Sequence, residues 1–398
     1  MKTAKLIFLS TLFIFSSQRA GLAASFDSGS TGADGALNII SNTTLSLPAN
    51  GMFNFTTINV ASGSTLKFLR NDLNTPVHLL ATSNVTIAGI IDISGLPGST
   101  SVAGQGGPGG FDGGNPAAGI DPPGDGYGPG AGTGGDPNFQ SASRARGGTY
   151  GTTTIYSSSN RYGNLYIQPL IGGSGGGGTS TNTSGILPYI EGGGGGGGAI
   201  LIASTTQITV SGSILAKGGA GTGSINFING GSGGAIRLVA PKVSGSGILN
   251  AGATPMGGVN GGPIAQAGDG RIRIDTPDTS GVGFNSTGRS SVGANMTVFP
   301  SPIPRLDVIG VASNSIPVGT NGTVFITLPL NTPTNQPVTV QAMDFSGQVS
   351  FEVVVTPMNG ASQRFPGLVD LTNTNRVVAI VNVIIPADIP CRINAWTR

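Results

Sequence analysis

A repeat of 36 residues constrains the fold of this chain more than any other feature. Three short apolar stretches, AILIAS from Ala199, AIRLVA from Ala235 and RIRIDT from Arg271, begin 36 residues apart. A repeated unit of this size cannot bury its apolar side alone, but stacked copies share a continuous core. The sequence therefore predicts a solenoid, and the shortness of the apolar stretches predicts that it is built from β-strands.

Alternation within the repeats predicts which side chains face the interior, because successive side chains of a strand point to opposite faces. Aliphatic residues occupy two columns, and we expect both to face inward, while the intervening column of Leu201, Arg237 and Arg273 faces solvent. An earlier copy, starting at Val77, aligns at an offset of 123 residues and puts His78 in the solvent-facing column. The expected core columns contain Ile200, Ile236, Ile272, Ile202, Leu238, Ile274, Val77 and Leu79.

These patterns predict an all-β protein with two folded parts. Residues 25–304 are expected to form a parallel β-helix with coils between about 36 and 300, and a β-sandwich is the main alternative. A Gly/Pro-rich segment at about 96–198 is expected to be one long insertion between two coils. After prolines at 300, 302 and 304, alternating strands predict an immunoglobulin-like β-sandwich over 305–398, without the cysteine pair typical of that fold.

Seven consecutive glycines, Gly192 to Gly198, lead from the insertion into the repeat at Ala199. A backbone without side chains can turn sharply or lie close against a neighbouring segment. Glycine runs also adopt the extended polyproline-II conformation, which has no internal hydrogen bonds, and several such segments could pack side by side. The sequence leaves these arrangements open.

The N-terminus has the features of a secretory signal peptide at 1–24. Lys2 and Lys5 precede an apolar stretch that is too short to span a membrane, and small residues follow it; a membrane anchor is the alternative. Removing the leader takes away three basic residues, so the acidic residues then outnumber the basic ones by one. We expect a secreted protein, extracellular or at the cell surface, with no transmembrane segment and no affinity for nucleic acid.

Cys391 is the only cysteine, so no disulfide can form within the chain. Stability must then come from repetition or from a large core. We expect the Cys391 side chain to be buried among apolar residues, and pairing with a second chain is the alternative.

Several stretches resemble a group of uncharacterised secreted bacterial proteins, which have glycine-rich parallel β-helices and a C-terminal immunoglobulin-like domain. The resemblance is carried by GGSGGAIRLVAPKVSGSGILNAG, GDGRIRID and the C-terminal stretches NQPVTVQA and FEVVVTPMNG, and it covers most of the mature chain. These motifs are structural, so the resemblance implies a fold and a location but no chemistry.

Acidic residues of the insertion form the first candidate binding site: Asp112, Asp121, Asp125 and Asp136. Their carboxylates could supply oxygen ligands to Ca²⁺ or contact sugars, and a solvated loop is the alternative. Their spacing matches no calcium motif, so we assign no metal ligand, no cofactor and no catalytic residue.

Tyrosines in the insertion form the second candidate binding site, and they include Tyr150, Tyr156 and Tyr162. Aromatic side chains among Asn, Ser and Gly suit a binding surface. The alternative is a small core that anchors the insertion. His78, the only histidine, has no evident partner and does not indicate catalysis.

The sequence predicts a non-enzymatic structural or adhesive protein, with glycans, surface components or a second copy of the chain as partners. The alternative is a polysaccharide lyase or hydrolase that uses Asp112, Asp121 or Asp125 as acid or base. Ice or mineral binding is a third possibility, but the threonine run at Thr152 does not recur at strand spacing.

Overall fold

The regular structure of this protein is entirely β among the residues that the computed structural model describes. These are residues 26–119, 121–135, 145–154, 157, 160–180, 190–221, 229–254, 256–257, 263–264, 267–319 and 323–397. The predicted signal peptide at 1–24 lies outside the described residues. Within them, no helix has the length and apolar character needed to cross a membrane.

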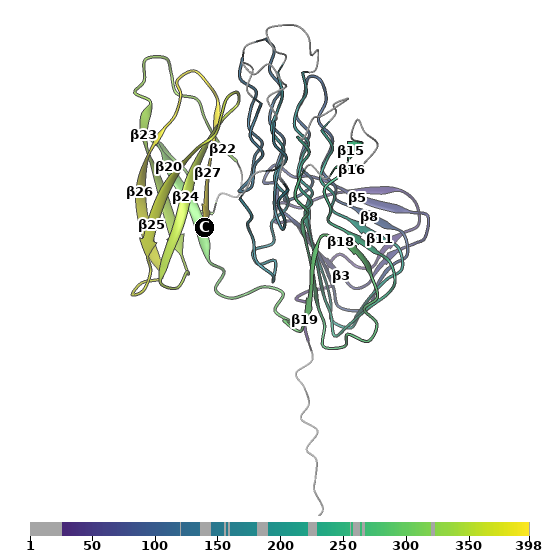
Figure 1. Ribbon diagram of the computed structural model, residues 1–398. Helices are drawn as coiled ribbons and strands as arrows, with labels where there is room; N and C mark the ends of the chain where they lie inside the picture. The colour runs from purple at the N-terminus through teal and green to yellow at the C-terminus, as the bar shows by residue number, and fades with distance from the viewer. Residues whose placement is uncertain are drawn as a thin grey trace, which may run out of the picture.

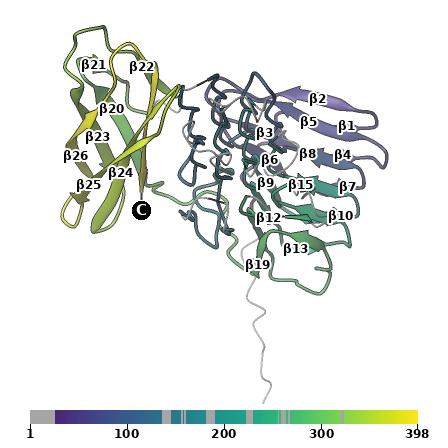
Figure 2. The same cartoon turned by 45° about the horizontal axis from the view of Figure 1, so that its top comes forward.

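The repeats build three stacked parallel sheets, and the chain adds a strand to each sheet in turn (Figures 1 and 2). The first sheet has β1 (Leu37–Ile39), β4 (Ile58–Val60), β7 (Val85–Ile87), β10 (Gln207–Val210) and β13 (Lys242–Ser244). The second has β2 (Thr43–Ser46), β5 (Thr65–Leu69), β8 (Ile90–Asp92), β11 (Ser213–Leu215), β14 (Ile248–Asn250) and β18 (Asn285–Thr287). The third has β3 (Met52–Phe55), β6 (Val77–Ala81), β9 (Ala199–Ser204), β12 (Ala235–Val239), β17 (Arg271–Asp275) and β19 (Arg289–Gly293).

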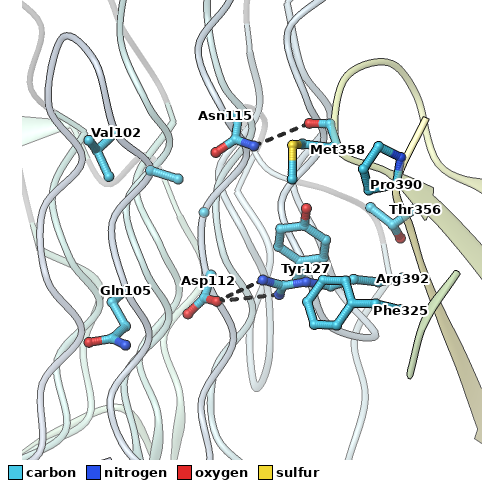
Figure 3. Close-up of a pocket in the computed structure, with 12 residues that line it drawn as sticks. Val102, Gln105, Asp112, Asn115, Tyr127, Phe325, Thr356, Met358, Pro390 and Arg392 are labelled. Atoms are coloured by element: carbon cyan, nitrogen blue, oxygen red, sulfur yellow. Dashed lines mark hydrogen bonds and ion pairs between the residues drawn. The ribbon is translucent and has the colours of Figure 1, made fainter. Parts of the chain in front are cut away.

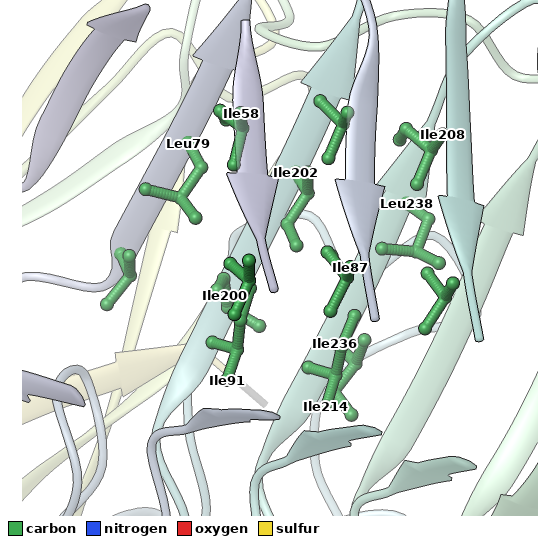
Figure 4. Close-up of a cluster of buried hydrophobic side chains, with 14 of the residues drawn as sticks. Ile58, Leu79, Ile87, Ile91, Ile200, Ile202, Ile208, Ile214, Ile236 and Leu238 are labelled. Carbon is green, nitrogen blue, oxygen red and sulfur yellow. The ribbon is translucent and has the colours of Figure 1, made fainter. Parts of the chain in front are cut away.

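Aliphatic side chains from all three sheets pack into one core, as Figure 4 shows. Ile236 on β12 is paired with Ile200 on one side and with Ile272 on the other. Val77 on β6 continues this column because it is paired with Ile200, and all four side chains are buried. The second column runs through Leu79, Ile202, Leu238 and Ile274 in the same way. The pairing register is therefore the one that the 36-residue spacing indicates.

The prediction that Leu201, Arg237 and Arg273 face solvent is wrong. Their side chains point away from the main core, but each is less than a tenth exposed. Leu201 belongs to a second apolar cluster that includes Val298, and Arg237 donates hydrogen bonds to the carbonyl oxygens of Thr297 (2.7 Å) and Asn295 (3.4 Å). The column is buried because the segment after β19 and residues 165–170 of the insertion together cover this face of the third sheet.

The expected exposure of His78 is also corrected by the structure. Its ring is partly buried, with its centroid 5.6 Å from that of Phe299, and its Nδ1 has no hydrogen-bond partner among the described residues. Burial lowers the pKa of His78 from 6.5 to about 4, against the opposing effect of hydrogen bonds to the backbone of Pro76 and Gly51. His78 is therefore neutral near pH 7.

The Gly/Pro-rich insertion between β8 and β9 forms part of a larger bundle. We call this unit the glycine bundle; it consists of residues 93–117, 123–135, 145–152, 172–179, 191–198, 216–221, 229–234, 251–253 and 267–270. The last four of these ranges lie in the connections from β11 to β12 and from β14 to β17, so three successive connections contribute, where the sequence predicted one insertion. A short hairpin of β15 (Met256–Gly257) and β16 (Pro263–Ile264) lies in the third connection.

The backbone amides of the glycine run donate hydrogen bonds to three neighbouring segments in rotation, so every third glycine donates to the same segment. All seven amides donate to carbonyl oxygens at 2.7–3.0 Å, and every partner lies in another segment of the glycine bundle. A three-residue period with no internal bonds is that of the polyproline-II helix. Gly192, Gly195 and Gly198 donate to Ser99, Leu96 and Ile93; Gly193 and Gly196 donate to Gly114 and Phe111; Gly194 and Gly197 donate to Asn229 and Ser232.

The close approach of these segments explains the glycines. A Cβ atom added at Gly193 would overlap the carbonyl oxygen of Gly176, and one at Gly196 would overlap that of Gly173. Gly192 to Gly198 are thus buried among other backbone segments. The run is neither a turn nor a spacer; it lies in the interior of the glycine bundle.

Residues 305–319 and 323–397 form two four-stranded antiparallel sheets that enclose a separate apolar core, and we call them the C-terminal sheet pair (Figure 1). Cys391 lies in this core, and burial raises the pKa of its thiol from 9 to about 11. One sheet has β20 (Arg305–Val311), β21 (Asn314–Ser315), β23 (Asn335–Met343) and β26 (Arg376–Ile384). The other has β22 (Val324–Ile326), β24 (Gln348–Pro357), β25 (Gln363–Asp370) and β27 (Cys391–Thr397).

Candidate functional site

The glycine bundle lies between the parallel sheets and the C-terminal sheet pair, and Asp112 joins all three parts (Figure 1). Its carboxylate accepts hydrogen bonds from Arg70, which follows β5, and from the amide of Gly106 at 2.9 Å. Arg392 on β27 donates to the same carboxylate from Nη1 and Nη2, at 3.3 and 3.2 Å. One acidic side chain therefore connects two arginines that are more than 300 residues apart in the sequence.

Aromatic rings hold the Arg392 side chain in place. Its guanidinium carbon lies 3.7 Å from the ring centroid of Tyr127 in the glycine bundle and 5.1 Å from that of Phe325 on β22. Figure 3 shows the guanidinium extending past both rings toward Asp112. Contacts between a guanidinium and an aromatic face are favourable, so the ion pair and the rings fix the orientation of Arg392 together.

A cavity of about 290 Å³ opens beside this ion pair, between the glycine bundle and the C-terminal sheet pair (Figure 3). Junctions between domains are frequent locations for ligand sites. The wall combines apolar, amide and charged groups from both parts. The lining residues are Val102, Ala103, Gln105, Asp112, Gly113, Asn115, Tyr127, Phe325, Thr356, Met358, Pro390 and Arg392.

Further contacts attach the C-terminal sheet pair to the glycine bundle. The Asp125 carboxylate accepts hydrogen bonds from the amide and hydroxyl of Ser362, at 2.8 and 2.7 Å, and from the amide of Gly134 at 2.7 Å. Asp125 is buried, so these bonds compensate the cost of removing its charge from water. Trp396 packs edge-on against Phe111 with ring centroids 5.3 Å apart.

The candidate aspartates do not act as one group. Asp112 is bound by arginines, Asp125 is bound by Ser362 and Gly134, and Asp121 is exposed. Asp136 lies outside the described residues. Among the residues that the structure describes, no group of three or more acidic, histidine or cysteine side chains has the geometry to hold a metal ion. The described aspartates therefore offer no Ca²⁺ cage.

Two of the candidate tyrosines anchor a connection, while Tyr156 lies outside the described residues. Tyr150 and Tyr162 stack with ring centroids 4.5 Å apart, and Arg271 on β17 lies over the Tyr150 ring. The Tyr162 hydroxyl donates to the carbonyl oxygen of Gly172 at 2.6 Å. Burial raises the pKa of both phenols, so they remain protonated. This arrangement matches the small anchoring core that was the alternative to a binding surface.

Sequence reasoning missed the half of the cavity that the C-terminal sheet pair supplies. Phe325 and Arg392 come from strands whose alternation indicates only a sheet, and no motif distinguishes them from other strand residues. Gln105 and Asn115 lie in a low-complexity stretch with no spacing signal. Their proximity depends on how the two parts dock, which local sequence patterns do not encode.

The Asp112 contacts predict an acid-sensitive junction. Burial opposes ionisation of Asp112, but the hydrogen bonds and positive charges of Arg70, Gly106 and Arg392 outweigh it and lower its pKa below 3.8. A carboxyl with a lower pKa in the folded state stabilises that state above its unfolded pKa, and this stabilisation is lost as the pH falls through the folded value. We therefore expect the junction to be intact at neutral pH and to weaken below about pH 4.

The fluorescence emission of Trp396, the only tryptophan in the sequence, measures directly whether the junction at Asp112 has opened. Acidification should shift its emission to the red as the contact with Phe111 is lost. Asp112→Asn should show the shifted emission already at pH 7. Asp370→Asn, on the exposed end of β25, is the matched control and should behave like the wild type. An unshifted Asp112→Asn spectrum at pH 7 would contradict the role given to this carboxylate.

Comparisons with protein-family models, with curated proteins and with solved structures found no match to this chain. The functional interpretation of the cavity therefore rests on the residues that form it.

Proposed function

We propose that this is an exported, non-enzymatic protein with a structural or adhesive role, extracellular or at the cell surface. In this proposal the three parallel sheets close into a parallel β-helix that serves as a rigid support. The C-terminal sheet pair is an immunoglobulin-like sandwich that is fixed to one side of the glycine bundle. Glycans, surface components or a second copy of the chain are the proposed partners.

The observation that carries the proposal is the three-residue hydrogen-bond period of the glycine run. Backbone bonds join Gly192–Gly198 to segments on several sides, so the segments of the glycine bundle form a packed unit. A rigid surface binds with a smaller loss of conformational entropy than a mobile loop. The common core of the three sheets supports the same conclusion, because it connects the repeats from β1 to β17.

The enzymatic alternative gains no support from the aspartates. A general acid or base must reach the proton that it transfers. Asp125 instead uses both carboxylate oxygens for bonds to Ser362 and Gly134, and Asp112 is engaged by Arg70 and Arg392. Asp121 is exposed. A single exposed carboxylate does not supply the acid and base pair that glycoside hydrolysis requires.

The proposal is tested with the purified mature chain in three assays. We expect retention on a glycan array or on coated surfaces, or concentration-dependent assembly in analytical ultracentrifugation. We expect no turnover of a polyuronate panel with added calcium. Absence of both retention and assembly would refute the structural or adhesive role. Turnover that Asp121→Ala abolishes would establish the enzymatic alternative in its place.

A further inference from the structure

The cavity beside Asp112 exposes apolar side chains at its rim. Phe325 is 56% exposed, Met358 is 44% exposed and Val102 is 61% exposed. Phe325 and Met358 come from the C-terminal sheet pair, and Val102 comes from the glycine bundle. Large apolar side chains that remain in water beside a cavity are available to a ligand, since covering them is favourable.

Amide groups in the same wall have unused hydrogen-bonding capacity. The Gln105 side chain is exposed and makes no hydrogen bond to the described residues. Asn115 donates from Nδ2 to the carbonyl oxygen of Met358 at 3.3 Å, which leaves its Oδ1 as an acceptor. An amide both donates and accepts, so it suits a ligand whose groups also do both.

The charges in the lining compensate each other. Asp112 and Arg392 are the two charged residues of the lining, and they are paired at 3.2 Å. A strongly anionic or cationic ligand would have to compete with one member of this pair. A neutral ligand with hydroxyl groups has no such cost, because a hydroxyl can accept from the Arg392 guanidinium without displacing Asp112.

We infer that this cavity binds a neutral pyranose residue of a polysaccharide. The apolar C–H face of the sugar ring would lie on Phe325 and Met358, and its hydroxyls would reach Gln105, Asn115 and the edge of the ion pair. The volume of about 290 Å³ suits one sugar residue with its chain continuing into solvent. This inference rests on the proposed adhesive function, because it names the ligand of that function.

The test uses the mature chain and neutral oligosaccharides of glucose, mannose and galactose, with oligogalacturonate as the acidic counterpart. Binding is measured by saturation-transfer NMR and calorimetry. We expect at least one neutral oligosaccharide to bind, and we expect Phe325→Ala to weaken that binding about tenfold and Gln105→Ala severalfold. Leu368→Ala on β25 is the matched control, because Leu368 is 58% exposed in the same sheet but does not line the cavity.

Three results would overturn the inference: no neutral oligosaccharide binds, only the acidic one binds, or Phe325→Ala binds as the wild type does. Surface retention of the same proteins separates this inference from the proposed function. If Phe325→Ala is retained on surfaces as well as the wild type, the cavity is not the site of adhesion, while the adhesive role itself still stands. If sugar binding depends on Phe325 but the protein shows neither surface retention nor assembly, the cavity is a sugar site and the structural or adhesive role is refuted.

Discussion

Replacement of Gly196 by alanine is expected to destabilise the protein by about 3 kcal/mol or more. The new methyl group would overlap the carbonyl oxygen of Gly173, which belongs to a backbone segment that is itself hydrogen-bonded to Gly197. A flexible side chain could rotate away from such an overlap, but a backbone carbonyl cannot. The segments must therefore separate, and buried amides such as that of Gly196 lose their partners.

Gly230→Ala is the matched control within the glycine bundle. A Cβ atom at Gly230 has its nearest neighbour, the carbonyl oxygen of Gly219, at 3.4 Å, which is ordinary van der Waals contact. Differential scanning calorimetry and limited proteolysis should show a large loss of stability for Gly196→Ala and little change for Gly230→Ala. Equal and small effects of the two substitutions would contradict the close backbone packing described for this unit.

Asp275→Ala is expected to cost about 3–5 kcal/mol, since it leaves buried positive charges without their counterion. The carboxylate is fully buried and accepts from Arg237 at 3.0 Å, from Arg273 at 2.7 Å and from the amide of Asn295 at 3.1 Å. Its removal would leave two guanidinium groups facing each other under the segment after β19. That segment would also lose a direct contact with β17.

Two variants make the Asp275 experiment specific. Lys67→Ala removes an ion pair with Asp92 whose lysine side chain is 58% exposed, so its cost should be below about 1 kcal/mol. Arg237→Leu should destabilise the protein less than Asp275→Ala does. Leucine suits the apolar cluster around Leu201, and Asp275 still has Arg273 as its counterion. Chemical denaturation measures all three. If Asp275→Ala loses as little stability as Lys67→Ala, the buried charges do not depend on this carboxylate.

Strand register could be predicted from the sequence, and the packing of the irregular segments could not. Side-chain alternation and the 36-residue spacing are sufficient to pair Ile200, Ile236 and Ile272. Arg237 occupies its expected column but is buried, because the segment at 295–298 that covers it is irregular and has no periodic pattern. Covering segments of this kind follow from the complete fold rather than from local sequence.

The candidate site, too, could be predicted from the sequence only in part. Asp112 could be selected from the sequence as an acidic residue of the insertion, but its partner Arg392 is 280 residues away. The glycine run could be recognised as able to pack closely, yet its partners could not be identified, because glycine has no side-chain pattern to specify a neighbour. The resemblance to secreted β-helix proteins gave no information on either point.

The polyproline-II backbone of the glycine bundle has a consequence for spectroscopy. This conformation is also a major one in unfolded chains, so circular dichroism would count much of the glycine bundle as disordered even in the intact protein. Slow amide hydrogen exchange at Gly192–Gly198 would distinguish the two conditions, since these amides are bonded and shielded from water. The glycine bundle is thus an ordered structure that circular dichroism does not distinguish from an unfolded chain.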